Sequence, residues 1–475
     1  MTSFAASMIV HVVLLVSLAL IVPQTAKKES PRIIRSAPVV EEAFEEFSDE
    51  SLDQPQSEES SSDSFMPEVP VNVDVQITET PTDVDMTSIS VELDTFGIEA
   101  APASDMLQTV GAIGGQAGGL SGRSDPTMRK TLVQQGGGNA QSEAAVEAGL
   151  KWIINHQMPD GGWSFNLLQC PSCQGKCSHA DTKDGRADRG GATAMALLPM
   201  LGRGYTHRTG PYQKQIEAGL TFLGQMVVAG KGQGYQSGGT LYSQGLVGIV
   251  LSESYAMTQD PRLAGPSQLA LNFIMNAQDP VGGGWRYAPR QPGDTSVVGW
   301  QLMALKSGHM AYLQVNPVTI AGAVKFLDSV AADDGAQYGY ATPGNGGGTS
   351  AVGLLCRMYL GWKKDHPALQ RGVARLAKLG PSTDLYFDYY ATQVLHHMEG
   401  DLWKGWNAKM RDMLVNAQAK NGHEEGSWYD KVDGGHGAHV GGRFYCTSLA
   451  TMILEVYYRH LPIYGQSSVE DEFKE

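Results

Sequence analysis

The chain has 475 residues and a formal net charge of −15. Nearly all of this acidity lies in residues 36–122, which hold 19 Asp and Glu residues and no Lys or Arg. Residues 123–475 are therefore close to neutral, and no basic block in them indicates a nucleic-acid partner.

An apolar segment begins the chain. Residues 1–26 contain no charged side chain, and the apolar run from Met8 to Val22 is interrupted only by His11 and Ser17. We predict a single-pass membrane anchor, with a cleaved signal peptide as the alternative, because the run is shorter than the roughly 20 residues that span a bilayer. Basic residues follow the run but none precedes it, so the positive-inside rule leaves the side of the membrane open.

Residues 27–141 are predicted to form a disordered linker. Its acidic part is rich in Ser, Pro, Glu and Asp and poor in aromatic residues, so it buries too little apolar surface to offset chain entropy. Gly-rich stretches at 111–122 and 134–141 extend the linker. A solvated spacer is the preferred interpretation, and an acidic docking tail is the alternative. Residues 465–475 form a short acidic tail.

Residues 142–464 carry a repeated pattern of an amphipathic helix, a Gln and a Gly-rich turn that ends in an aromatic residue, clearest in 148–163, 269–285 and 410–428. The pattern predicts an all-α domain of six outer and inner helix pairs that closes into a double ring around a central cavity. Outer helices are expected to begin near Ser142, Pro211, Pro261, Pro317, Pro367 and Leu402, and inner helices near Gly191, Thr240, Asp294, Thr349, Thr383 and Gly442.

The pattern resembles the QW motif of squalene-hopene and oxidosqualene cyclases, whose α6/α6 toroid is shared with protein prenyltransferase β subunits. The whole chain is similar to membrane-anchored prenyltransferase/squalene-oxidase repeat proteins of planctomycete-type bacteria. The resemblance implies an α6/α6 toroid with a hydrophobic, isoprenoid-type ligand in its cavity. The motif itself is expected to be structural, because Gln157, Gln278 and Gln418 can bond helix-end carbonyls while the aromatic ring packs over them.

Asp294 and Asp388 are the candidate catalytic carboxylates. Cyclases of this family protonate an alkene with an Asp from a D-x-D-D-T-A motif at an inner-helix start. Asp294 matches the end of that motif, but Gln291 and Gly293 stand where its other two matched carboxylates would be. The alternative role for Asp294 is a helix N-cap.

Asp388 matches the Asp of the Asp-x-Cys zinc motif of protein prenyltransferases. Tyr390 replaces the motif's Cys, and Cys446 replaces the distant His ligand. The resemblance leaves open a rebuilt zinc set of Asp388, Cys446 and either His396 or His397. The alternative is a buried apolar thiol and hydrogen-bonded helical histidines.

Aromatic residues at expected cavity positions are candidates for ligand contact. In cyclases such rings stabilise carbocations through cation–π contacts, whereas ordinary core packing is the alternative for each of them. The candidates are Tyr242, Trp300, Tyr386, Tyr389, Tyr390 and Tyr445.

A cysteine-rich loop follows the first Trp of the pattern. Cys170, Cys173, Cys177 and His179 lie within ten residues and offer four ligands for tetrahedral Zn²⁺, which we expect to be structural. A disulfide and free thiols are the alternatives.

These features predict a squalene-cyclase/prenyltransferase-like toroid that acts on or binds a hydrophobic ligand, although the usual catalytic motifs are degenerate. The alternative is a non-catalytic binding or scaffold toroid of the cell envelope. In both, the N-terminal helix would tether the toroid to a membrane, and the partner would be a hydrophobic small molecule or an envelope component.

Overall fold

The computed structural model describes the toroid-forming part of the chain. The predicted anchor at residues 1–26, most of the predicted linker and the tail at 465–475 lie outside the described residues. Within the described residues, no helix is both long and apolar enough to cross a membrane. The structure describes residue 120 and residues 123–177, 188–236, 238–429, 435–461 and 463.

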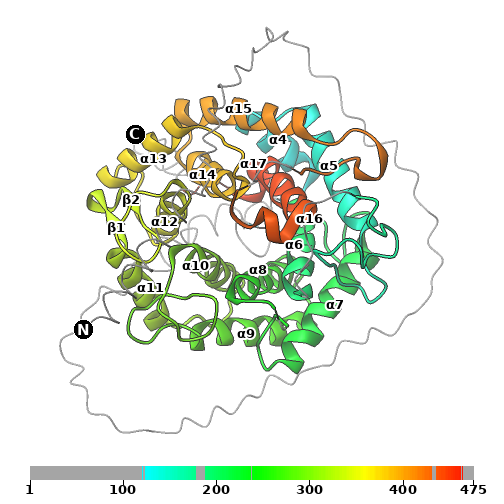
Figure 1. Ribbon diagram of the computed structural model, residues 1–475, viewed down its shortest axis with the longest axis horizontal. Helices are drawn as coiled ribbons and strands as arrows, with labels where there is room; N and C mark the ends of the chain where they lie inside the picture. Colours follow the sequence, from blue (N-terminus) through cyan, green and yellow to red (C-terminus); the bar gives the residue numbers. More distant parts are fainter. Residues whose placement is uncertain are drawn as a thin grey trace, which may run out of the picture. The chain divides into compact units, whose positions relative to one another are not determined.

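The helices of this part form two concentric rings (Figure 1). The inner helices are α6 (Arg189–Gly202), α8 (Leu241–Thr258), α10 (Thr295–Met310), α12 (Gly347–Tyr359), α14 (Leu385–Met398) and α16 (Gly435–Leu454). The outer helices are α5 (Ala140–Asn155), α7 (Gln213–Ala229), α9 (Pro261–Asn276), α11 (Pro317–Ser329), α13 (Pro367–Leu379) and α15 (Gly400–Ala417).

Both rings close on themselves. Each inner helix contacts the next inner helix along the chain, and α16 returns to contact α6. In the outer ring, α15 contacts α5. The predicted all-α, α6/α6 toroid is therefore confirmed.

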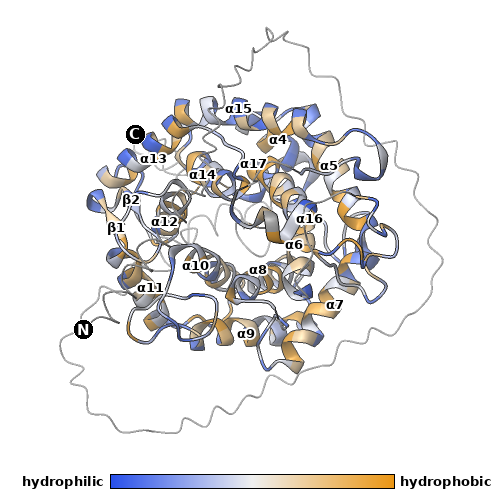
Figure 2. Ribbon diagram, viewed as in Figure 1, coloured by the Kyte–Doolittle hydropathy of each residue, from blue (hydrophilic) through white to orange (hydrophobic). Residues whose placement is uncertain are grey.

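The two rings differ in sequence pattern because they differ in burial. Inner helices such as α8 and α10 are buried on nearly every side, and their apolar residues are spread around the whole helix and not along one stripe. Outer helices bury one stripe only, and hydrophilic residues lie along the outer edge of the ring (Figure 2). Outer helices α9 and α11 begin at Pro261 and Pro317, and Asp260 and Asn316 cap them. Pro suits the first turn because the N–H it lacks would have no helical partner there.

The repeated Gln and Trp residues join neighbouring repeats. The Gln157 side-chain amide donates to the carbonyl oxygen of Gly161 in its own turn, at 2.7 Å, and to that of Gln215 in the next outer helix, at 2.8 Å. Gln278 forms the same pair of bonds with Gly283 and Thr319. The expectation that the motif glutamines bond helix-end and turn carbonyls is confirmed.

The motif tryptophans fix each turn to the helix before it. The indole nitrogens of Trp163, Trp285 and Trp428 donate to the carbonyl oxygens of Ile153, Ile274 and Leu414, at 2.7–2.8 Å. Each of these rings is buried, so the turn forms part of the core. Each indole N–H thus donates to a carbonyl near a helix end, where the backbone carbonyls have no N–H partner within the helix.

Glycine is required in these turns by a close approach of two backbones. Gly283 has φ +76°, and a Cβ there would lie 2.0 Å from the carbonyl oxygen of Gly322 in α11. A larger residue would push the turn off the next outer helix.

One helix was missed by the sequence analysis. Residues 126–136, assigned to the disordered linker, form α4 (Pro126–Gly136), which Asp125 caps and which ends at Gly137 in the left-handed conformation. It contacts α17 (Val456–Arg459), and its Val133 is buried. The prediction was wrong here because α4 is polar and adjoins a Gly run, so its stability depends on tertiary packing.

Buried charges lie where the two ends of the described chain meet the ring. The Arg123 guanidinium lies 2.8 Å from the Glu253 carboxylate of α8, and Arg459 of α17 lies 3.6 Å from the same carboxylate. All three side chains are almost fully buried.

The short elements of the fold are β1 (Ala331–Ala332), antiparallel to β2 (Gln337–Tyr338), and the 3-10 turns η2 (Asp333–Gly335) and η3 (Gly422–Glu424).

Candidate functional site

The first turns of several inner helices lie against one another at one end of the ring. Ser243 in α8 donates a hydrogen bond to Asp188, which caps α6. Tyr386 in α14 donates its hydroxyl to the backbone oxygen of Ser296 in α10, at 3.3 Å. The helix starts thus bring side chains from different repeats into one cluster.

Five tyrosines of this cluster, Tyr242, Tyr287, Tyr340, Tyr386 and Tyr445, are here called the tyrosine mouth. The hydroxyls of Tyr287 and Tyr340 lie 2.5 Å apart, and these two residues are 42% and 38% exposed. The ring of Tyr242 lies 6.0 Å from that of Tyr287, between centroids. Tyr287 and Tyr340 are therefore the solvent-exposed part of the mouth, and the other three members are predicted ligand contacts.

A cation lies over the exposed part of the mouth. The Arg286 guanidinium stands 5.6 Å from the ring centre of Tyr287 and 5.4 Å from that of Tyr340. Such cation–π contacts orient both the cation and the rings.

The irregular start of α16 lies against Tyr386 of the mouth, whose ring centroid is 6.0 Å from that of His436. His436, Gly437 and Gly442 have non-helical backbone angles, so the regular helix begins near the predicted start at Gly442. The Nδ1 atom of His436 lies 2.7 Å from the carboxylate of Asp384, the α14 N-cap, and this contact raises the pKa of His436. Tyr445 donates its hydroxyl to the His436 carbonyl oxygen at 2.9 Å, so this segment is fixed to the mouth.

Asp294 occupies the N-cap of α10. One carboxylate oxygen accepts the Val297 N–H at 3.0 Å, and the other accepts the Tyr340 hydroxyl at 3.1 Å. The Arg286 Nε atom lies 3.9 Å away. Burial raises the pKa of Asp294 in spite of these partners. The capping role is confirmed, and the catalytic role stays a prediction.

Asp388 lies on a different face of α14 from the mouth residue Tyr386. Residues two apart on a helix point to nearly opposite sides, whereas Asp388 and Thr392 share a side. Thr392 accepts the indole N–H of Trp406 in outer helix α15, so this side faces the outer ring. The Asp388 carboxylate accepts the Ser382 N–H at 3.1 Å, and burial raises its pKa to about 8. No described contact brings Asp388 to Asp294.

The other three predicted ligand contacts form a closed aromatic cluster. Trp300 stacks on Tyr389 at 5.4 Å with an interplanar angle of 15°, and Tyr390 lies edge-on to Trp300 at 5.5 Å. All three are at most 3% exposed. Tyr386 joins this cluster to the mouth, because its ring lies 5.0 Å from that of Tyr390. Of the six predicted ligand contacts, Tyr242 and Tyr445 are partly exposed, whereas Tyr386 is only 6% exposed.

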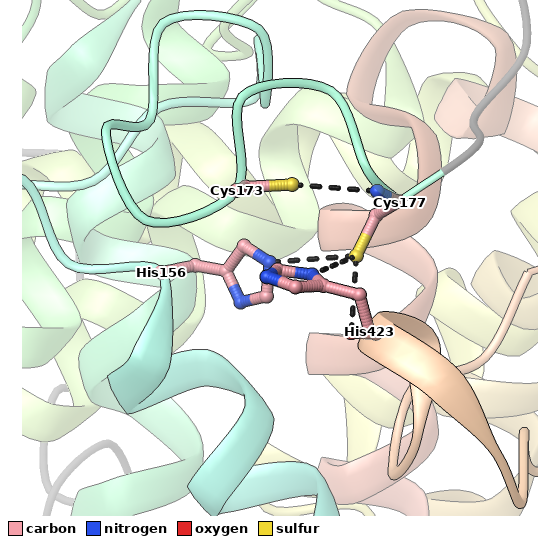
Figure 3. Close-up of side chains that lie close together, drawn as sticks. All are labelled: His156, Cys173, Cys177 and His423. Carbon is pink, nitrogen blue, oxygen red and sulfur yellow. Dashed lines mark hydrogen bonds between the residues drawn. The ribbon is translucent and has the colours of Figure 1, made fainter.

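A second cluster, of histidine and cysteine side chains, lies where the end of α5, the cysteine loop and η3 meet. His156, Cys173, Cys177 and His423 place one potential metal ligand each within 4.8 Å of one another (Figure 3). The Cys177 sulfur lies 3.5 Å from Nε2 of His156 and 3.1 Å from Nδ1 of His423. These four residues, here called the His/Cys cluster, form a possible metal site.

The His/Cys cluster shares two members with the predicted set. Cys170 lies outside it, since its sulfur contacts the Ser172 hydroxyl at 3.1 Å, and His179 is not among the described residues. No disulfide links the loop cysteines. In the described part of the chain, Asp388, Cys446 and the pair His396–His397 form no such group, so this structure gives the rebuilt zinc set no support.

His156 and His423 were not among the residues predicted to bind a metal. His156 directly precedes Gln157 of the first motif, and His423 follows Gln418 in the turn of the last motif. Both lie beside the turn of a Gln-turn-Trp motif, and the ring brings the last repeat beside the first.

Comparisons with known proteins give similarity in architecture alone. No protein-family model and no curated protein match the sequence. An inactive variant of an alpha-1,6-mannanase of Salegentibacter sp. HEL1_6 in complex with alpha-1,6-mannotriose is 10% identical, at TM-score 0.47, covering 67% of this chain and 99% of that one. A variant of type II terpene cyclase MstE from Scytonema, in complex with its product merosterolic acid A, is 14% identical, at TM-score 0.46, covering 68% of this chain and 98% of that one. Such values carry no argument about ligand or activity.

Proposed function

We propose that the toroid binds a hydrophobic, isoprenoid-type ligand at the tyrosine mouth and holds it without protonating it. The observation that supports this proposal is the gathering of five tyrosines from separate repeats, with two of their rings exposed. Tyrosine rings offer large apolar faces and lose little conformational entropy on binding. A flexible hydrocarbon chain could pack along several of these ring faces.

A binding role accounts for the state of the carboxylates better than acid catalysis does. Asp294 caps α10 and accepts the Tyr340 hydroxyl, while Asp384 caps α14 and contacts His436. Asp388 lies on the helix side that faces the outer ring. A catalytic acid must reach the reacting atom of the substrate, and none of these groups is placed for that without giving up a structural bond.

We further propose that residues 1–26 tether the toroid to a membrane, from which a lipid-like ligand would reach the mouth. The apolar run from Met8 to Val22 supports this proposal. Membrane fractionation of cells expressing the full chain, compared with a chain that begins at residue 27, tests it. Recovery of both proteins in the soluble fraction would contradict it.

The binding proposal is tested by calorimetric titration with geranylgeraniol and squalene. We expect the double variant Tyr287→Ala, Tyr340→Ala to bind about tenfold more weakly or worse, because both exposed faces are lost. Tyr312→Ala is the matched control, since Tyr312 is 69% exposed but follows the C-terminal end of α10. Absence of binding to both lipids, or equal losses in both variants, overturns the proposal.

A turnover assay separates binding from catalysis. After incubation with either lipid, we expect only unchanged lipid by mass spectrometry. Cyclised or hydrated products that disappear in Asp294→Asn would replace the binding proposal with acid catalysis.

A further inference from the structure

We propose that His156, Cys173, Cys177 and His423 bind one zinc ion, and that this ion fastens the first repeat of the ring to the last. Two thiolates and two imidazoles are a common ligand set for tetrahedral zinc. With zinc–sulfur and zinc–nitrogen bonds of about 2.3 and 2.0 Å, neighbouring ligand atoms lie about 3.3–3.8 Å apart. The Cys177 sulfur already lies 3.5 Å and 3.1 Å from the two imidazole nitrogens, so small shifts complete the site.

Both imidazoles are oriented as metal ligands. The Nδ1 atom of His156 lies 2.6 Å from the Trp152 carbonyl oxygen, so its N–H donates there and Nε2 keeps a lone pair toward Cys177. The Nε2 atom of His423 lies 3.3 Å from the Ser172 carbonyl oxygen, which leaves its Nδ1 lone pair for the cluster. A backbone carbonyl on the second ring nitrogen is the usual support of a metal-bound histidine.

The cysteine loop is shaped for a metal as well. The Cys177 N–H donates to the Cys173 sulfur at 3.4 Å, so the loop holds the two cysteines beside each other. Cys173 and Cys177 are fully buried, as is His156. Two buried thiolates would be costly without a cation, and a divalent ion would balance their charge.

The cluster lies across the seam where the ring closes (Figures 1 and 3). His156 follows the last residue of α5, and Cys177 lies in the loop between α5 and α6. His423, 246 residues further along the chain than Cys177, lies in η3 after α15. Its carbonyl oxygen also accepts the Trp152 indole N–H at 3.2 Å. The four protein ligands leave no open position, so the ion would be structural.

The test is metal analysis of the purified full chain, reconstituted with zinc under reducing conditions. We expect about one zinc ion per chain in the wild type and in Cys170→Ser, the matched control from the same loop. Cys173→Ser and His423→Asn should lose the ion. Because the His423 side chain is partly exposed and lies in the short turn η3, its variant should keep the helical circular-dichroism spectrum, so metal loss cannot be ascribed to unfolding.

Hydrogen exchange tests the fastening role. Removal of zinc by a chelator should increase exchange in residues 140–177 and 400–428, and leave α9 to α11 on the far side of the ring unchanged. A zinc-free wild type, a disulfide between Cys173 and Cys177, or metal loss in Cys170→Ser but not in His423→Asn overturns the site. A uniform increase in exchange overturns its role at the seam.

Discussion

The Gln418 side chain of the last motif donates its amide to the carbonyl oxygen of Ala145 in the first outer helix, at 2.8 Å. The same amide donates to Gly426 in its own turn, at 3.0 Å. Gln278 forms the equivalent pair of bonds between two repeats in the middle of the chain. The ring therefore closes through the contact that also joins consecutive repeats, although residues 145 and 418 are 273 positions apart.

Gln418→Ala is expected to lower the free energy of unfolding by about 1–3 kcal/mol, because two carbonyl groups lose their donor. Urea denaturation followed by circular dichroism measures this change. Gln278→Ala is the matched comparison, since it removes the same bonds away from the seam. If this contact holds the seam, the two variants should lose similar amounts of unfolding free energy. An unchanged stability of Gln418→Ala would show that other contacts hold the ring closed.

Asp388→Asn is expected to change how stability depends on pH. Burial raises the pKa of Asp388 from 3.8 to about 8, so the folded chain keeps a proton that the unfolded chain loses between these values. The stability contributed by this proton is complete below pH 4 and is lost as pH rises through 8. The variant removes this loss, and its Asn oxygen can still accept the Ser382 N–H.

Melting curves of wild type and Asp388→Asn across this pH range provide the measurement. The stability difference in favour of the variant should grow with pH, by at most about 1.4 kcal/mol per pH unit. Asp401→Asn, at a fully exposed position, is the control and should follow the wild type. A difference that does not vary with pH would contradict the buried, protonated state of Asp388.

Lys306→Met is expected to stabilise the protein. The Lys306 ammonium nitrogen in α10 is buried and has no hydrogen-bond partner among the described residues, and burial lowers its pKa from 10.5 to about 7. The unfolded chain therefore binds a proton more tightly between these values, and the wild type loses stability as pH falls toward 7. Methionine has a similar length and no charge to desolvate.

The gain should be of the order of 3–5 kcal/mol at pH 7 and should shrink as pH rises to 10. Thermal unfolding at several pH values measures it, with Lys404→Met as the control at an exposed position. A melting temperature that falls in Lys306→Met would mean that the ammonium group has a stabilising partner.

Much of the fold could be predicted because its signals are local. Proline at 261, 317 and 367 marks helix starts that the structure places at those residues. The Gln and Trp of each motif bond to carbonyls of the turn and of adjoining helix ends, so the pattern itself reports their role. Helix α4 was not predicted because its sequence is polar, and the burial of its Val133 in the core leaves no local pattern in the sequence.

The candidate sites were predicted only in part. Tyr242, Tyr386 and Tyr445 do meet at the mouth, because each lies in the first turns of an inner helix. The histidines of the His/Cys cluster were not predictable from the cysteine loop alone, since His423 comes from the last repeat of the chain.

The sequence by itself determined the helices, their caps and the six-fold repetition, because helix periodicity and capping act over a few residues. Only the tertiary structure decided which side chains meet across the ring. The neighbours of Cys177 and the closed packing of Trp300 on Tyr389 both depend on how six repeats pack and where the ring closes. Each repeat is rotated slightly relative to the one before, and these rotations accumulate over some 300 residues. No local sequence pattern therefore predicts which residues meet where the ring closes.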